Sequence, residues 1–175
     1  MKFSEPQKLQ DGRYFVKVKT DFVQMNKTKL LTPFAEGDSV TLTVDGTVFS
    51  SIDEQIISAA KENSTQWFGR EVQPKTIEAA YQKSTSGDSI NLNKFKNIKA
   101  FDASRASIDP NELEADTECD CIIELVGLWF MKKTFGVHWR IVQIRKKKEP
   151  RKKIYETYLF TDEQDDSDDD DDDSL

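Results

Sequence analysis

The chain has 175 residues and a formal net charge of −7, but ten of its acidic residues and no basic one lie in residues 161–175. Without those ten charges, residues 1–160 carry +3, so the body of the protein is mildly basic. That length predicts one domain of about 150 residues and a tail. With no N-terminal apolar segment and no run of about 18 apolar residues, the sequence predicts a soluble, intracellular protein that does not cross a membrane.

Three segments in the first 50 residues have the pattern of strands. Residues 14–19 and 40–44 alternate between apolar and polar side chains, as strands with one buried face do. Residues 30–34 form a shorter candidate, which Pro33 restricts to the edge of a sheet. Asp45-Gly46 then predicts a hairpin turn, with a return strand beginning at residues 48–49.

A helical region follows these strands. The apolar spacing changes there and predicts a helix over residues 52–63, introduced by a capping box of Ser51 and Glu54. A second helix is predicted over residues 75–82, with Pro74 in its first turn.

The second half of the body predicts three more strands. Residues 90–98 alternate, but the alternation breaks in the middle and predicts a bulge. In the acidic connection that follows, Asp109 and Pro110 predict the start of a short helix. Residues 119–131 and 137–145, joined by a short segment that contains glycine, predict a long hairpin.

Alternation within this hairpin predicts which of its side chains are buried. Odd-numbered residues of 119–131 are expected to face the core, Trp129 among them, and Trp139 is expected there too. The outer face is expected to hold Glu124, Phe130 and Lys132.

The two cysteines of the chain, Cys119 and Cys121, point to the same face of a strand, and Asp120 points to the other. Two thiols and the single His138 are too few for a four-ligand zinc site. The spacing therefore favours a reduced structural pair over a metal or redox site.

These elements predict a mainly β protein with helical inserts. The order strand, strand, helical insert, strand, short helix, strand, strand fits an OB-like closed antiparallel barrel, with the helix 52–63 inserted between the second and third strands. An antiparallel sandwich is the alternative, because periodicity alone does not separate the two. We expect an OB-like domain over residues 1–155 and a disordered acidic tail over residues 156–175.

The sequence offers little for catalysis. It has one histidine, no Gly-rich phosphate loop and no nucleophile motif. A metal-dependent nuclease would need clustered carboxylates, for which the candidates are Asp102, Asp109, Asp116 and Glu118. Carboxylates scattered along a loop are usually solvated, so we predict no enzyme, no metal and no cofactor.

Basic and aromatic residues alternate on several predicted strands, which favours nucleic-acid binding. OB barrels that bind single strands combine a cationic groove with aromatic rings on which bases stack, and each stacked base contributes about 1–3 kcal/mol. Phe95, Phe130 and Phe135 are the predicted stacking platforms. The predicted DNA-binding residues are Lys17, Lys19, Lys94, Phe95, Lys96, Phe130, Lys132, Lys133, Phe135, Arg140, Arg145 and Lys146.

The C-terminal part of the chain separates its charges. Residues 146–153 hold a basic run that would serve as a DNA contact or as a nuclear import signal. The tail that follows is expected to bind partner proteins through Asp168, Asp169, Asp170, Asp171, Asp172, Asp173 and Leu175. A polyanionic tail beside a basic surface also predicts competition with DNA for that surface.

A long terminal hairpin over residues 124–144, followed by a basic stretch and a polyacidic terminus, resembles the single-stranded DNA-binding proteins of the phage gene-2.5 type. More closely, the chain is similar to their counterparts in large DNA viruses of algae and protists. The resemblance implies an OB barrel that coats single-stranded DNA in viral replication and recombination, often as a dimer. It also implies a tail that binds replication proteins, and a location in the host nucleus or at a viral replication site. The family's tail usually ends in an aromatic residue, whereas this one ends in Leu175.

A different class of function remains open at this stage. In a protein-interaction module such as a histone chaperone, the acidic tail would be the active part and would bind basic partners. Deleting the tail separates the two, since it would abolish chaperone activity and strengthen DNA binding.

Overall fold

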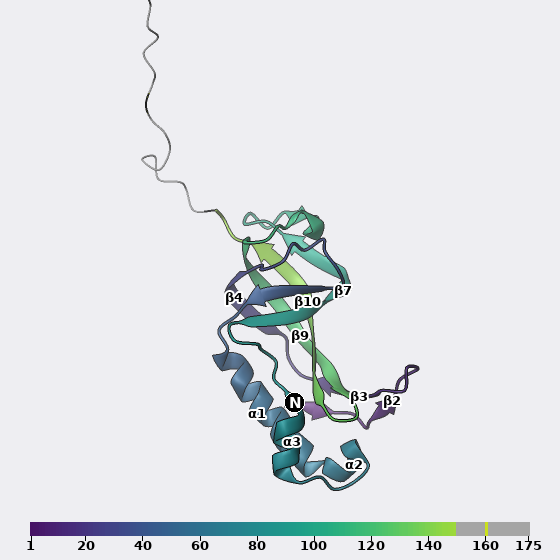
Figure 1. The fold of residues 1–175 in the computed structure, drawn as a ribbon. Helices are drawn as coiled ribbons and strands as arrows, with labels where there is room; N and C mark the ends of the chain where they lie inside the picture. Colours follow the sequence, from purple (N-terminus) through teal and green to yellow (C-terminus); the bar gives the residue numbers. More distant parts are fainter. Residues whose placement is uncertain (150–159, 161–175) are drawn as a thin grey trace, which may run out of the picture.

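The computed structural model describes residues 1–149 and residue 160 (Figure 1). The acidic tail and the second half of the basic run lie outside the described residues. The predicted tail disorder and the boundary at residue 155 therefore stay predictions.

Ten strands, three α-helices and one 3₁₀-helix make up the described part of the chain. The strands are β1 (Lys2–Phe3), β2 (Gln7–Lys8), β3 (Tyr14–Lys19), β4 (Val23–Lys29), β5 (Ser39–Thr43), β6 (Tyr81–Gln82), β7 (Ser89–Phe101), β8 (Ser107–Ile108), β9 (Glu118–Phe130) and β10 (Phe135–Lys146). The helices are α1 (Thr47–Glu62), α2 (Ser64–Phe68), α3 (Pro74–Ala80) and the 3₁₀-helix η1 (Pro110–Glu112). None of the described helices is long and apolar enough to cross a membrane.

The long hairpin of β9 and β10 organises the sheet and runs through most of the molecule in Figure 1. On one side, β3 and β4 pair with β9 one after the other. On the other side, β10 pairs with β7, which pairs with β5. The order β4-β9-β10-β7-β5 is consistent with the predicted OB-like fold.

Two parts of the predicted fold class are wrong. The sheet is not purely antiparallel, because β10 runs parallel to β7. Nor do paired strands close it. In the described residues, an isolated bridge joins Leu30 to Leu42, with the Leu31 N–H donating to the Thr41 carbonyl, and the Lys29 N–H of β4 donates to the Thr43 hydroxyl of β5. The predicted strand over residues 30–34 is reduced to this bridge, and the chain turns away before Pro33.

The helices form an insertion between β5 and β7, as predicted, and gather around one end of the hairpin (Figure 1). However, α1 begins at Thr47, where a return strand was expected, because the Asp45 carboxylate accepts the Thr47 N–H and starts a helix instead of a hairpin. Phe49 then lies on the buried face of α1, and the predicted capping box at Ser51 lies inside the helix.

A buried hydrogen-bond network holds this insertion to the sheet. The Asp53 carboxylate of α1 accepts the Tyr81 hydroxyl and the Ser84 hydroxyl, both at 2.6 Å. The Ser84 oxygen in turn accepts the Trp139 indole N–H at 3.0 Å. A buried carboxylate is tolerated only when such donors replace water, so the network fixes α1 against β10.

A shift of register in the hairpin reverses its faces. From Cys119 to Leu125 the odd positions are buried, as predicted. The pairing then skips Val126, because His138 pairs with Gly127 while Trp139 pairs with Leu125. Beyond the shift the even positions of β9 face inward. The predictions that Trp129 is in the core and Phe130 on the outer face are therefore wrong.

The other local predictions in the second half are confirmed. The break in β7 is a bulge, since Ile141 pairs with Lys94 but Gln143 pairs with Lys99. The Asp109 side chain accepts the Asn111 N–H and caps η1.

The cysteine pair lies inside the barrel, as expected. Cys119 and Cys121 are buried free thiols with 3.8 Å between their sulfur atoms. The hydrogen bond from Cys119 and burial raise the pKa of the Cys121 thiol. Asp120 points to the opposite face, where it pairs with Arg145 and Lys147.

Candidate nucleic-acid interface

Rings from four strands gather on the outer face of the sheet. Val16 and Val18 of β3 are buried, so Phe15 and Lys17 point outward, and the register shift turns Trp129 of β9 to the same side. His138 and Arg140 of β10 and Phe95 of β7 complete the set. We call this surface the outer strip and define it as Phe15, Lys17, Phe95, Trp129, His138 and Arg140.

Two glycines inside strands make room for the rings of the outer strip. A Cβ atom on Gly127 would lie 2.3 Å from the Phe15 ring, and one on Gly136 would lie 2.6 Å from the Trp129 ring. Phe15 and Trp129 are cross-strand partners, so their rings are neighbours on the outer face. Glycine in a strand interior is otherwise unfavourable, and here it lets aromatic rings lie directly on the backbone.

His138 lies beside the Phe15 ring, edge to face, with 6.2 Å between the ring centroids. Its Nδ1 is 3.4 Å from the Asn93 amide nitrogen of β7. Burial and the neighbouring Arg140 guanidinium lower the pKa of His138 below its ordinary value. The imidazole is therefore neutral at pH 7 and presents an aromatic face rather than a charge.

Arg140 connects the outer strip to β7. Its guanidinium stands 4.5 Å from the centroid of the Phe95 ring and pairs with Glu124 at 2.7 Å. The sequence prediction placed Phe95 and Arg140 in the interface, and the structure brings them into contact. Lys17, Lys19 and Lys96, also predicted, are exposed, and none makes an ion pair within the described residues.

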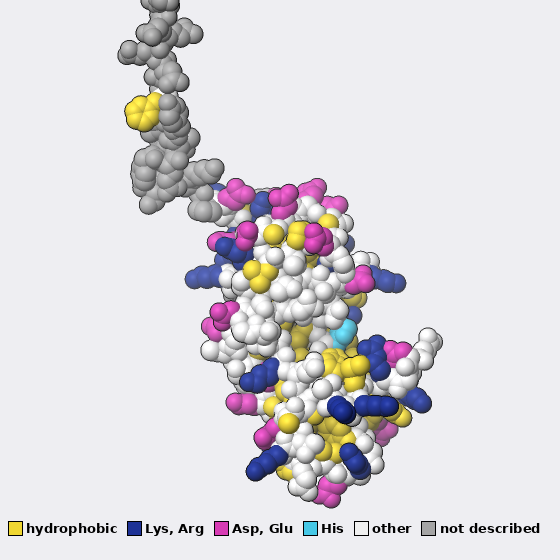
Figure 2. All heavy atoms as spheres, in the orientation of Figure 1, with side chains coloured by type: hydrophobic (Ala, Val, Ile, Leu, Met, Phe, Trp, Pro, Cys, Tyr) yellow, Lys and Arg dark blue, Asp and Glu magenta, His cyan; other side chains and the backbone are white. Residues whose placement is uncertain are grey.

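The remaining predicted residues at the hairpin tip lie on the opposite face. There a groove of about 740 Å³ is lined by residues of α2, α3 and the tip of β9 and β10. We call it the tip groove and define its cations as Arg13, Arg70, Lys132 and Lys133. Figure 2 shows hydrophobic side chains gathered between the helices and the hairpin, with Lys and Arg along their border.

Phe130 and Phe135 are not the exposed platforms that the sequence predicted. Their exposed fractions are 7% and 1%, and their rings stack on each other at 5.5 Å with an interplanar angle of 5°. Phe68 and Trp67 of α2 pack edge to face against Phe130. The pair belongs to the core that docks the helices. The register shift turned Phe130 inward, and Phe135 begins β10 on the same buried face as Trp139.

Lys94, which the sequence predicted to bind DNA, is bonded to the protein's own backbone in the structure. Its side chain points to the end of the barrel, where the ammonium donates to the carbonyls of Phe34, Glu36 and Gly37. It is thus a structural residue that closes a loop. Arg145 and Lys146 are on the surface but are paired with Asp120 and Glu149.

The carboxylates considered for a metal enzyme do not form a site. Across residues 1–149 and 160, no three His, Cys, Asp or Glu side chains lie close enough together to hold a metal ion.

Sequence reasoning missed Phe15, Trp129 and His138 as interface residues. Alternation assigned Trp129 to the core, and the His138 pattern was equally typical of packing. The signal that could have found them is the pair Gly127 and Gly136, since glycine within a strand marks a place where a ring or another chain comes close.

Comparisons with known proteins show which family and which solved structures the chain resembles. The sequence profile of a family of unknown function, DUF5871, matches residues 26–162, and no curated protein matches. The single-stranded DNA-binding protein of bacteriophage Enc34 is 18% identical, with a TM-score of 0.51 over 87% of this chain and 94% of that one. Its C-terminal truncation is 16% identical, with a TM-score of 0.50 over 85% and 96%. The gp2.5 protein of bacteriophage T7 is 9% identical, with a TM-score of 0.48 over 76% and 94%. The resemblance of the fold to phage single-stranded DNA-binding proteins is confirmed.

Proposed function

The chain belongs to the family of unknown function DUF5871, and we propose that it is a single-stranded DNA-binding protein that coats DNA without regard to sequence. The observation that carries the proposal is the outer strip, where Phe15 and Trp129 lie on interior glycines on the same face as Lys17 and Arg140. The likeness in fold to the single-stranded DNA-binding protein of Enc34 supports it.

The outer strip contains the two ingredients that such binding needs. Bases stack on Phe15, Trp129 and Phe95, and every base has a face that can do so, which makes the binding tolerant of sequence. Phosphates are neutralised by Lys17 and, at the other end, by Arg140. The Arg140 guanidinium is already oriented by Glu124 and Phe95, so less side-chain freedom is lost when DNA binds.

Fluorescence titration with poly-dT, poly-U and duplex DNA at two salt concentrations tests the proposal. Trp129→Ala should weaken poly-dT binding by about 5- to 150-fold, the value of one stacked base, and leave the salt dependence unchanged. Val48→Ala is the control, because it removes an exposed apolar side chain on α1, away from the outer strip. Equal affinities of the Trp129→Ala variant and the native protein would exclude the outer strip as the site.

The tail supports a second part of the proposal. Its ten carboxylates have the charge of a short nucleic acid, and fifteen extended residues span up to ~50 Å, so they can reach any face of the domain. We propose that residues 161–175 compete with DNA for the cationic surface and recruit replication proteins during viral replication and recombination. Competition of this kind weakens with salt in the same way as phosphate binding.

Deletion of residues 161–175 tests this regulation. The truncated protein should bind oligonucleotides more tightly than the full chain at low salt, and the difference should vanish at high salt. If the truncated protein instead binds DNA no better and loses binding to histones, the tail acts as a chaperone segment and the autoinhibition proposal fails.

A further inference from the structure

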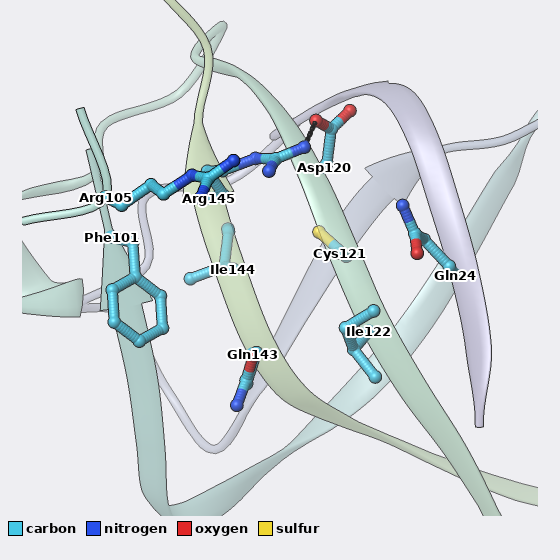
Figure 3. Close-up of a pocket in the computed structure, with 9 residues that line it drawn as sticks. All are labelled: Gln24, Phe101, Arg105, Asp120, Cys121, Ile122, Gln143, Ile144 and Arg145. Atoms are coloured by element: carbon cyan, nitrogen blue, oxygen red, sulfur yellow. Dashed lines mark hydrogen bonds and ion pairs between the residues drawn. The ribbon is translucent and has the colours of Figure 1, made fainter. Parts of the chain in front are cut away.

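A pocket of about 290 Å³ continues the outer strip toward the other end of the hairpin (Figure 3). Beyond Arg140 and Glu124, the buried pair Ile141 and Ile123 is followed by a register shift and then by Gln143 with Ile122, which line this pocket. We call it the end pocket. The register shift at Val142 keeps Gln143 and Ile122 on the outer face, so a strand bound along the outer strip would run to the mouth of the pocket.

The walls of the end pocket suit a flat ring with polar edges. Ile122 supplies an apolar floor, and the half-buried Phe101 at the end of β7 supplies an aromatic wall. In Figure 3, Phe101 and Gln24 stand on opposite sides of β9 and β10. The carboxamides of Gln24 and Gln143 carry both donors and acceptors, which match the edges of any nucleobase. The volume is near the lower end of the range of about 300–1,000 Å³ for small-ligand sites.

The rim of the end pocket is cationic. Arg105 and Arg145 both line the pocket (Figure 3), and Arg145 pairs with the Asp120 carboxylate at 2.7 Å. Lys147 pairs with the same carboxylate at 3.2 Å, so the single negative charge of Asp120 is shared by two cations. Although burial raises the pKa of Asp120, Arg145, the Lys27 N–H and Lys147 outweigh it and lower that pKa. This leaves Arg105 available for an anion.

Backbone strain is concentrated around this pocket. The described residues contain three non-glycine residues with positive φ, and two of them are Lys27 at 58° and Arg105 at 71°. The Lys27 N–H donates to Asp120, and the turn that carries Arg105 is held by the Asp102 carboxylate, which accepts the N–H groups of Ser104 and Ala106. Strained residues persist where the surrounding contacts hold them, and they concentrate at ligand sites.

We propose that the end pocket binds one unstacked base of the single strand that lies on the outer strip. The base packs against Phe101 and is hydrogen-bonded by Gln143 and Gln24, and its phosphate is held by Arg105. This inference rests on the proposed function, and it adds a subsite in which one nucleotide at the end of the bound segment is held by its edges as well as its face.

The test uses the full-length protein and the shortest oligo-dT that keeps full affinity, so that the strand cannot slide. A single abasic nucleotide is placed at each position in turn. In the native protein, one position near an end of the oligonucleotide should lose about 5- to 100-fold in affinity, in addition to the positions over the outer strip. Phe101→Ala should cause a comparable loss with the intact oligonucleotide and remove the effect of the abasic nucleotide at that position alone.

Two further variants separate binding from folding. Gln143→Ala removes an exposed side chain and should repeat the effect of Phe101→Ala in weaker form, while Gln66→Ala on α2 is the matched control and should change nothing. If Trp129→Ala weakens binding but Phe101→Ala and Gln143→Ala do not, the end pocket is empty and the proposed function stands. If the native protein does not bind oligo-dT, both proposals fail.

Discussion

On the outer face of the β9–β10 hairpin, the rings of Phe15 and Trp129 lie over glycines and are only partly buried, whereas on the inner face Phe130 and Phe135 stack on each other in the core. Both faces are rich in aromatic residues and bordered by lysine or arginine. The two faces differ in what packs against the rings. Trp67 and Phe68 of α2 and Tyr81 of β6 pack against the inner rings and bury them, whereas the outer rings stay half-exposed. The number of aromatic rings near cations therefore does not identify a binding site. The face of the strand on which the rings lie does.

Removing an aromatic ring from the inner face is the strongest test of the difference between the two faces of the hairpin. Phe135→Ala should lower the free energy of unfolding by about 3–5 kcal/mol, because the side chain is fully buried among Phe68, Tyr81 and Phe130. Urea denaturation measures this loss, with Trp129→Ala as the matched aromatic variant of the outer face. A Phe135→Ala protein of native stability and reduced DNA affinity would show that the inner face binds the strand after all.

A glycine variant tests whether the outer rings need their bare backbone. Gly136→Ala places a methyl group 2.6 Å from the Trp129 ring, which must move away. Overpacking of this kind should cost about 1–3 kcal/mol of stability, and the displaced ring should also weaken poly-dT binding. Gly46→Ala is the control, because its new methyl group would meet nothing nearer than 3.9 Å. Unchanged stability and affinity in the Gly136→Ala variant would mean that the ring has no fixed position on the strip.

Much of this architecture could be predicted from the sequence, because it depends on local patterns. Strand alternation located β3, β5 and the long hairpin, and the Asp109 cap located η1. The sequence did not reveal that the sheet stays open between β4 and β5. This depends on where the chain turns after Leu30 and not on any local preference. The start of α1 was also hidden, because Asp45-Gly46 is compatible with a hairpin and with a helix start.

The faces of the hairpin were predicted only up to its bulge. A period of two assigns every later residue to the wrong face once the pairing skips a single residue, here Val126. As a result, the predicted platform Phe130 is a core residue, and Trp129, predicted to be core, is on the surface. Phe135 is buried for another reason, because β10 begins at Phe135 and not at the predicted residue 137. Phe95, predicted as a stacking platform, is half-buried beneath the Arg140 guanidinium, and its role in binding stays a prediction. The bulge of β7 was visible as a break in the alternation of the strand.

Lys17 and Lys94 were both predicted to contact DNA, and replacing each of them compares an exposed lysine of the outer strip with a lysine that is bound to a loop. Lys17→Met should lower the slope of log affinity against log salt by ~0.7, the value for one phosphate on a single strand, because Lys17 is exposed on the outer strip. Lys94→Met should leave that slope unchanged and lower the free energy of unfolding by about 1–3 kcal/mol, since three loop carbonyls lose their donor. Titrations at several salt concentrations and urea melts of both variants decide this. A slope change in the Lys94→Met variant would place its ammonium at the DNA instead of in the loop.

The smallest expected effect concerns His138, which differs from the other outer rings in that it can take a proton. Because burial and Arg140 lower its pKa in the folded state, the unfolded chain binds that proton more readily. Stability should therefore be unaffected by His138 above its ordinary pKa near ~6.5 and should fall as the pH drops from there toward the folded-state value.

A phosphate held beside the His138 ring favours the protonated form, so the same acidification should strengthen DNA binding. Unfolding and binding measured between pH 5 and pH 7 in the native protein and in His138→Gln should show both trends only in the native protein. If both proteins respond alike to pH, His138 is a packing residue of the strip and takes no part in contacting the strand.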